Sequence, residues 1–190
     1  MTDADVLDLF RKSGALLEGH FRLSSGLHSQ RYLQSALVLQ HPEYASRLGT
    51  AIADRVRDYA VNVVLSPALG GIVIGQEVGR ALGVRAIFAE RQDGRLSLRR
   101  GFSLSPADRA LIVEDVITTG GSTRETIDVA AAAGARIAGA AAIIDRGTQS
   151  DRLNVALVAL VKLEVPVYDP AECPLCASGE PVTKPGSRSS

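Results

Sequence analysis

Between residues 61 and 165 the sequence alternates short, continuously apolar runs with segments of helical periodicity. The apolar runs are 61–66, 84–90, 110–115, 135–145 and 154–165, and the helical segments are 72–82 and 123–134. Strands that are apolar on both faces are typical of parallel sheets, because the helices of the crossover connections cover both sides. The pattern therefore predicts an α/β fold with a central, mostly parallel sheet flanked by helices.

The N-terminal third has a different character. Residues 2–17 predict a helix, which Thr2 caps together with Asp5 three residues later. A second helix is predicted over 42–59, opened by a proline. Between the two helices, the Gly/Ser-rich stretch 19–33 has the alternating character of short strands and loops.

Length and composition bound the classes of protein that fit. With 190 residues, we expect one domain over 1–190, ending in an irregular Pro/Gly/Ser-rich tail over 166–190. Lys+Arg and Asp+Glu balance at 21 each, which argues against nucleic-acid binding through bulk positive charge. No run reaches the roughly 18 apolar residues of a membrane span, and the acidic N-terminus is unlike a signal peptide. Two cysteines exclude a disulfide scaffold, so the reducing cytoplasm is the expected compartment.

The most informative stretch is ALIVEDVITTGGS, in which an apolar strand ends in the carboxylates Glu114 and Asp115. Residues 118–122 then supply hydroxyls and glycines where the next helix begins. Backbone N–H groups at a helix N-terminus favour an anion, and glycines let the backbone approach a phosphate closely. Acids beside a phosphate would repel it unless they bind something else, and ribose hydroxyls or a metal ion fit that role. The spacing predicts a ligand site at the carboxyl end of this strand.

This stretch resembles the ribose-phosphate-binding motif of the type I phosphoribosyltransferase family, in which apolar residues, two acids and two apolar residues precede a T-x-G-x loop. The resemblance implies the fold of that family, with a small base-binding hood over residues 1–40. It also implies a catalytic role for Asp115. The residues expected to bind phosphoribosyl diphosphate are Arg91, Glu114, Asp115, Val116, Ile117, Thr118, Thr119, Gly120, Gly121 and Ser122.

Further segments resemble the branch of this family that acts on orotate. SPALGGIVIG is similar to its pyrophosphate loop, Arg146 after a strand matches an arginine that holds the orotate ring, and Thr118 is expected to contact orotate as well. The stretch EGHFRLSSGLHSQRYL is similar to its base-binding segment at Phe21, Leu23, Ser25, Gly26, Ser29, Tyr32 and Leu33.

The resemblance also implies an activity. The 5-phosphoribosyl group would pass from phosphoribosyl diphosphate to orotate, a step of pyrimidine (UMP) biosynthesis that yields orotidine 5′-monophosphate and pyrophosphate. Mg²⁺ is expected to arrive mainly with the substrate rather than in a metal site of the protein. A homodimer that shares a loop across its interface is expected.

Positive charge for a diphosphate is concentrated in RQDGRLSLRR (91–100), which carries four arginines and one aspartate. By itself the segment also fits a solvated basic hairpin. The resemblance implies a mobile loop that closes over the site. The commoner family pattern has two lysines and a histidine there, where this chain has Gln92, Arg95 and Ser97. We therefore expect Arg95 to be the catalytic loop residue, stabilising charge, since a guanidinium is a poor general acid.

The histidines and cysteines carry no chemistry in this interpretation. His20, His28 and His41 are scattered along the chain. Cys173 and Cys176 form one CPLC, half the ligand set of a zinc site. With no second cysteine pair and no following histidine, such a site would need ligands from another chain. We expect two plain thiols near a turn.

Two alternatives stay open. One is a phosphoribosyltransferase for another base such as a purine, which the match at Arg146 argues against. The other is a regulator that senses phosphoribosyl diphosphate and binds nucleic acid, which the neutral charge argues against. We expect neither a nucleic acid nor a membrane as partner.

Overall fold

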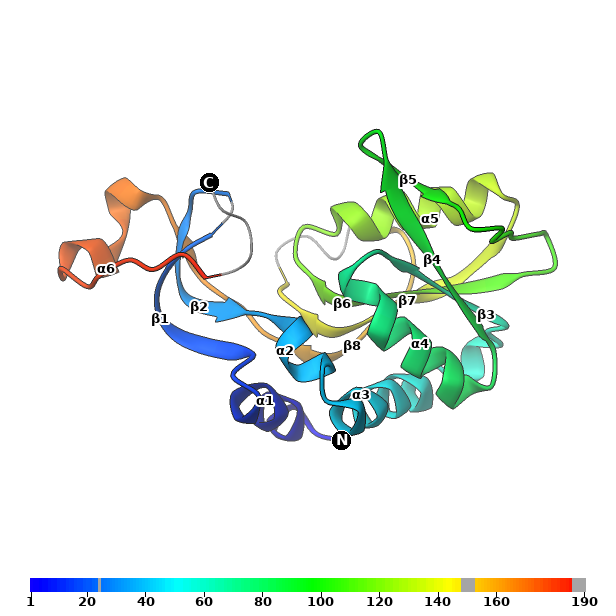
Figure 1. Ribbon diagram of the computed structural model, residues 1–190, viewed down its shortest axis with the longest axis horizontal. Helices are drawn as coiled ribbons and strands as arrows, with labels where there is room; N and C mark the ends of the chain where they lie inside the picture. Colours follow the sequence, from blue (N-terminus) through cyan, green and yellow to red (C-terminus); the bar gives the residue numbers. More distant parts are fainter. Residues whose placement is uncertain (24, 148–152, 186–190) are drawn as a thin grey trace.

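The computed structural model describes the chain except for residues 24, 148–152 and 186–190. It contains a six-stranded sheet of order β5-β4-β3-β6-β7-β8 and a three-stranded sheet of order β1-β2-β9 (Figure 1). Along the chain the elements are α1 (Asp3–Lys12), β1 (Leu16–Arg22), β2 (His28–Leu33), α2 (Ser35–Leu39), α3 (Pro42–Arg55), η1 (Arg57–Tyr59), β3 (Val63–Pro67), α4 (Gly70–Leu82), β4 (Arg85–Gln92), β5 (Arg95–Leu98), β6 (Arg109–Ile117), α5 (Gly121–Ala132), β7 (Arg136–Asp145), β8 (Leu157–Lys162), β9 (Val167–Tyr168), η3 (Pro170–Glu172) and α6 (Pro174–Ala177).

The large sheet confirms the predicted α/β fold. Strands β4, β3, β6, β7 and β8 are parallel, and β5 is antiparallel to β4 at the edge. One apolar cluster, which includes Leu48, Ile74 and Leu111, lies on one face of the sheet, and a second, which includes Leu65 and Ile112, lies on the other. Because both faces are covered, the central strands are apolar throughout rather than alternating.

Helices α3 and α4 approach each other closely on the first face. A Cβ on Gly49 of α3 would lie 2.5 Å from Cβ of Glu77 and 2.8 Å from its backbone carbon. No side chain fits at that distance, so the crossing of the two helices depends on glycine at position 49.

The first helix is shorter than predicted. The capping box of Thr2 and Asp5 is confirmed, but α1 ends at Lys12, and the expectation of a helix to residue 17 is wrong. Gly14 takes a positive φ of 68°, and β1 begins at Leu16. The apolar residues after Gly14 continue a helical spacing in the sequence, but they belong to a strand.

The small sheet joins the two ends of the described chain. Strands β1 and β2 form an antiparallel hairpin, and β9 pairs with β2 through His28–Tyr168 and Ser29–Val167. The tail then crosses β1, where the N–H of Thr183 donates to the carbonyl of His20 over 2.8 Å. The tail that the composition predicts to be irregular therefore contains a strand and two short helices.

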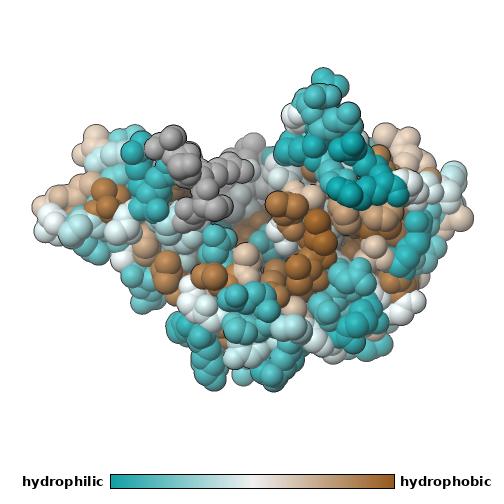
Figure 2. All heavy atoms as spheres, in the orientation of Figure 1, coloured by the Kyte–Doolittle hydropathy of each residue, from teal (hydrophilic) through white to brown (hydrophobic). Residues whose placement is uncertain are grey.

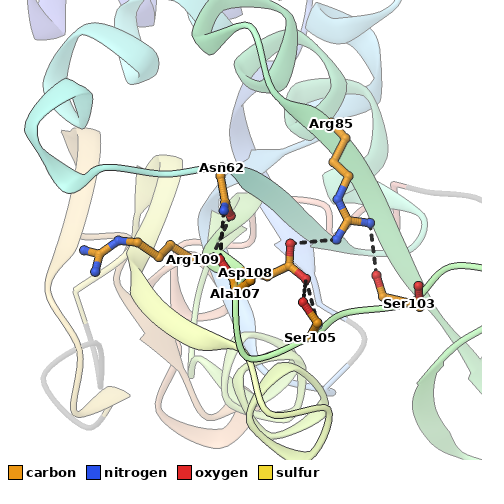
Figure 3. A network of polar contacts seen from close by, with 7 residues as sticks. All are labelled: Asn62, Arg85, Ser103, Ser105, Ala107, Asp108 and Arg109. Carbon is orange, nitrogen blue, oxygen red and sulfur yellow. Dashed lines mark hydrogen bonds and ion pairs between the residues drawn. The ribbon is translucent and has the colours of Figure 1, made fainter.

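A polar network fixes the segment that leads into β6 (Figure 3). Arg85 of β4 donates to the carbonyl of Ser103 and, over 2.9 Å, to Asp108, whose other oxygen accepts from the N–H and hydroxyl of Ser105. Arg85 and these donors hold the pKa of Asp108 below its ordinary value. Asn62 bridges the carbonyl of residue 107 and the N–H of residue 109. The start of β6 is therefore held by side chains from β4 and from the segment before β3.

In the described part of the chain, no helix is long and apolar enough to cross a membrane.

Candidate active site

The two predicted acids lie three and two residues before Ile117, the last residue of β6, and they point to opposite faces of the sheet, because successive side chains of a strand alternate. Glu114 faces α5, where its carboxylate accepts a hydrogen bond of 2.5 Å from the hydroxyl of Thr123. Asp115 faces the start of α4, where a Cβ on Gly70 would lie 2.8 Å from its Oδ1. The pair therefore brackets the carboxyl end of β6 from two sides.

Burial changes the titration of both acids. Burial, with the charge of Asp115 adding to it, raises the pKa of Glu114 from 4.5 to about 7, although the Thr123 hydroxyl opposes the shift. Burial also raises the pKa of Asp115, against a hydrogen bond from the backbone of Val116. Carboxyl groups with raised pKa values at a strand end are typical of functional sites.

The loop after β6 turns into α5 at Gly120, which takes a positive φ of 72°. The positive φ favours glycine here, and a Cβ would also lie 3.1 Å from the side chain of Leu153, which would have to shift. At Gly121 the nearest atom to a Cβ would be the Thr119 hydroxyl at 3.7 Å, which leaves the backbone open on that side. The first N–H groups of α5 have no partner within their own helix, so a phosphate at this end would be favoured.

A cleft of about 350 Å³ lies over this loop. It brings together most of the residues predicted to bind phosphoribosyl diphosphate, together with one that was not predicted, Glu125. The lining residues are Arg91, Glu114, Val116, Thr118, Thr119, Gly120, Gly121, Ser122 and Glu125. Asp115, Ile117, Arg95 and Arg146 are not among them, and the side chain of Ile117 lies in the core.

Glu125 of α5 connects the cleft to the basic segment. Its carboxylate accepts a hydrogen bond of 2.8 Å from the guanidinium of Arg91 and one of 2.7 Å from the backbone N–H of Leu96. One carboxylate thus holds both strands of the β4–β5 hairpin against α5. In the sequence, Glu125 is an ordinary acid of an amphipathic helix, and no spacing rule connects it to Arg91.

The basic segment 91–100 is a hairpin rather than an open loop. Strands β4 and β5 pair from Ala89–Leu98 to Gln92–Arg95, with the turn at residues 93 and 94. Arg95 and Arg99 are exposed, and Arg100 pairs with Glu90 over 2.7 Å. The hairpin stands out beside α5 in Figure 1 and is hydrophilic in Figure 2.

Arg146 follows β7, next in the sheet to β6, and its backbone N–H donates to the carbonyl of Ile117 over 2.9 Å. Its side chain is half-buried, and this burial lowers the pKa of the guanidinium. None of the ion pairs among the described residues involves Arg146. A half-buried cation that pairs with none of the described carboxylates is well suited to an anionic ligand.

The structure corrects one premise about the cysteines. His20, His28, Cys173 and Cys176 lie together, with one potential ligand atom from each within 4.8 Å of all the others. The expectation that a zinc site here would need ligands from another chain is therefore wrong. The sequence does not reveal this group because two of its residues come from the N-terminal hairpin and two from the tail.

Comparisons with known proteins agree on one family. A family model described as "Phosphoribosyl transferase domain" matches residues 35–164. The chain is 53% identical over 189 residues to an orotate phosphoribosyltransferase of Chlorobium phaeobacteroides, covering 100% of this chain and 98% of the relative. It is 53% identical over 190 residues to the orotate phosphoribosyltransferase of Heliobacterium modesticaldum, covering 99% of this chain and 100% of the relative.

Solved structures agree on the fold. The orotate phosphoribosyltransferase of Aeropyrum pernix superposes with a TM-score of 0.72 at 24% identity, covering 84% of this chain and 94% of that one. The Mycobacterium tuberculosis orotate phosphoribosyltransferase in complex with 5-phospho-alpha-D-ribosyl 1-diphosphate superposes with a TM-score of 0.67 at 22% identity, covering 85% of this chain and 96% of that one. At these identities the likeness concerns the fold.

Proposed function

Because the chain belongs to the phosphoribosyl transferase family, we propose that it transfers the 5-phosphoribosyl group of phosphoribosyl diphosphate to orotate. The products are orotidine 5′-monophosphate and pyrophosphate, and the reaction serves pyrimidine biosynthesis. The observation that carries the proposal is the cleft over the β6–α5 loop, in a chain about half identical to orotate phosphoribosyltransferases over its full length.

The 5′-phosphate binds at residues 118–122, where hydroxyls and the N-terminus of α5 provide donors. Glu114 and Asp115 accept hydrogen bonds from the ribose hydroxyls, on the two sides of the strand end. A carboxyl group whose pKa lies near 7 loses its proton readily once such a donor arrives. Both acids then orient the sugar without repelling the phosphate beyond it.

Arg146 pairs with the carboxylate of orotate, and Thr118 contacts the ring. A ring nitrogen of orotate forms its bond to the anomeric carbon and gives up its proton to the leaving diphosphate, while the bond from that carbon to the diphosphate oxygen breaks. The sugar passes through an oxocarbenium-like state, so stabilising the leaving diphosphate matters more than a covalent nucleophile. Arg95 on the hairpin supplies that positive charge when the hairpin approaches the cleft.

Mg²⁺ is carried by the diphosphate. Among the described residues, the one group of three or more potential ligands is the His/Cys group of the small sheet, so no such carboxylate cluster lies at the cleft. Glu114 and Glu125 are the carboxylates that line it. These residues fit an ion that reaches the site on its substrate, and its chemistry is to neutralise the charge of the leaving group.

The test is direct. The purified chain with Mg²⁺ and orotate should change the ultraviolet absorbance of orotate when phosphoribosyl diphosphate is added. Asp115→Asn should lose nearly all turnover while keeping the wild-type circular dichroism, and Asp128→Asn on the exposed side of α5 is the matched control. No absorbance change with the wild-type chain would refute the activity. Turnover of adenine or hypoxanthine instead of orotate would assign another base.

A homodimer with a shared hairpin is part of the proposal. Leu69 is 83% exposed, Val73 is 44% exposed, and Figure 2 shows a hydrophobic area near the start of α4. Exposed apolar patches of this kind mark association surfaces. Mixing Arg95→Ala with Asp115→Asn subunits should restore about a quarter of wild-type activity if the hairpin serves the partner's site, because half of the dimers then carry one intact site. Unchanged, background-level activity of the mixture would show that each hairpin serves its own subunit.

The cytoplasm is the proposed location, which the two free cysteines support.

A further inference from the structure

Two histidines and two cysteines meet between the hairpin β1–β2 and the tail. His20 lies on β1 and His28 begins β2, while Cys173 precedes α6 and Cys176 lies within it (Figure 1). The four potential ligand atoms lie within 4.8 Å of one another. His20, His28 and Cys173 are buried, and Cys176 is exposed.

The distances are close to those of a tetrahedral site. Zinc bonds of about 2.1 Å to nitrogen and 2.3 Å to sulfur place a nitrogen and a sulfur ligand about 3.6 Å apart, and two nitrogens about 3.4 Å apart. Nε2 of His20 lies 3.6 Å from Sγ of Cys173 and 3.7 Å from Sγ of Cys176. Nδ1 of His28 lies 3.2 Å from Sγ of Cys176 and 2.8 Å from Nε2 of His20. An ion would require the histidine nitrogens to separate by about half an ångström.

A backbone contact orients one of these ligands. Nδ1 of His20 lies 2.7 Å from the carbonyl oxygen of Glu180, so its N–H donates there. In that tautomer Nε2 carries a lone pair that points at the other three residues. Histidines that bind metals have this second contact as a rule, because it fixes both ring orientation and proton position.

The tail has no apolar core that would hold it in place. Between Pro166 and Pro185, Cys173 is the single buried residue, and the rest are exposed or half-buried. Small irregular segments of this kind are commonly fastened by a metal or by disulfides. The two cysteines are free, so no disulfide has this role.

We propose that His20, His28, Cys173 and Cys176 bind one Zn²⁺ ion, which fastens the tail to the β1–β2 hairpin. Two thiolates and two neutral imidazoles form a closed set that leaves no position for a substrate, so the ion is structural. The two thiol protons are released as the ion binds. All four ligands lie outside residues 35–164, the part of the chain that the family model matches.

Metal analysis of the wild-type, full-length chain tests the proposal. Purified without chelators, it should contain about one zinc per chain, and a mercurial thiol reagent should release that zinc. Exchange into Co²⁺ should give the intense visible bands of a tetrahedral cobalt–thiolate site. Absence of stoichiometric zinc after growth with added zinc, together with no cobalt spectrum, would overturn the proposal. A Cys173–Cys176 disulfide in the protein purified under reducing conditions would overturn it as well.

Single substitutions locate the ion. Cys176→Ser and His28→Asn should each lose the bound zinc, whereas His41→Asn, a histidine outside the group, should retain it. A glutamate-specific protease should cut the wild-type tail after the exposed Glu172 much faster once a strong chelator is added, and should cut the Cys176→Ser tail at that fast rate without chelator. Full zinc retention by Cys176→Ser and His28→Asn would refute this ligand assignment even if zinc is present.

Discussion

Glu114 offers the sharpest test of how the strand end is built. A carboxyl group whose pKa is about 7 in the folded chain and 4.5 when solvated holds its proton in the folded state over a range where the unfolded chain has lost it. The folded state then binds more protons than the unfolded state, so the free energy of unfolding must fall as pH rises from about 4.5 to about 7. Above that range both states are ionised, and the contribution becomes constant.

The size of this fall in the free energy of unfolding follows from the pKa shift of Glu114. Each pKa unit corresponds to about 1.4 kcal/mol, so the fall attributable to Glu114 is on the order of 3 kcal/mol. Glu114→Gln keeps an oxygen that accepts from Thr123 and removes the charge. Between pH 5 and pH 8, the free energy of unfolding of the variant should therefore rise by roughly 2 to 3 kcal/mol relative to that of the wild type.

Urea denaturation at pH 5, 6, 7 and 8, without substrate and at constant ionic strength, measures this difference. Circular dichroism is the suitable probe, because the chain contains no tryptophan. Glu43→Gln, an exposed glutamate at the start of α3, is the control and should differ from wild type by the same amount at every pH. Parallel curves for Glu114→Gln and wild type would show that Glu114 is ionised in the folded chain throughout, and would refute the argument from burial.

Three further predictions concern single positions. Gly49→Ala should lower the free energy of unfolding by about 1 to 3 kcal/mol in urea denaturation, because its Cβ would overlap Glu77; an unchanged stability would contradict the close helix contact. Arg95→Ala should reduce kcat more than Arg99→Ala in the orotate assay, and the reverse order would move the catalytic role to Arg99. Arg146→Ala should raise the KM for orotate about 10- to 100-fold and leave the KM for phosphoribosyl diphosphate nearly unchanged, whereas a wild-type KM for orotate would refute the base pocket.

Much of the large sheet was predictable because its determinants are local. The apolar strands, the glycine turn at residue 120 and the acids at the end of β6 are each encoded within a few neighbouring residues. The role of Glu125 in the cleft was not predicted, because its partner Arg91 lies in another element and only the folded sheet brings the two residues together. The helix predicted to residue 17 was too long because Leu16 continues the apolar spacing, while Gly14 ends the helix through its positive φ.

The group of His20, His28, Cys173 and Cys176 was not predicted from the sequence for a different reason. A CPLC with no histidine after it has only half of a ligand set, and spacing along the chain cannot reveal ligands from distant strands. The pairing that aligns the two halves is β9 with β2, a strand of two residues whose sequence has no recognisable pattern. Long-range contacts made by short elements leave almost no trace in local sequence.

The same pairing sets the order in which the protein can be completed during synthesis. Strand β2 leaves the ribosome early, but its neighbour β9 follows only after the whole large sheet has been made. Contacts so distant in sequence form late, since the intervening loop must close first. The large sheet can therefore assemble while the hairpin beside it still lacks its third strand. Truncation before β9 would leave an open edge on the β1–β2 hairpin, so nascent chains would form the large sheet before the small sheet is complete.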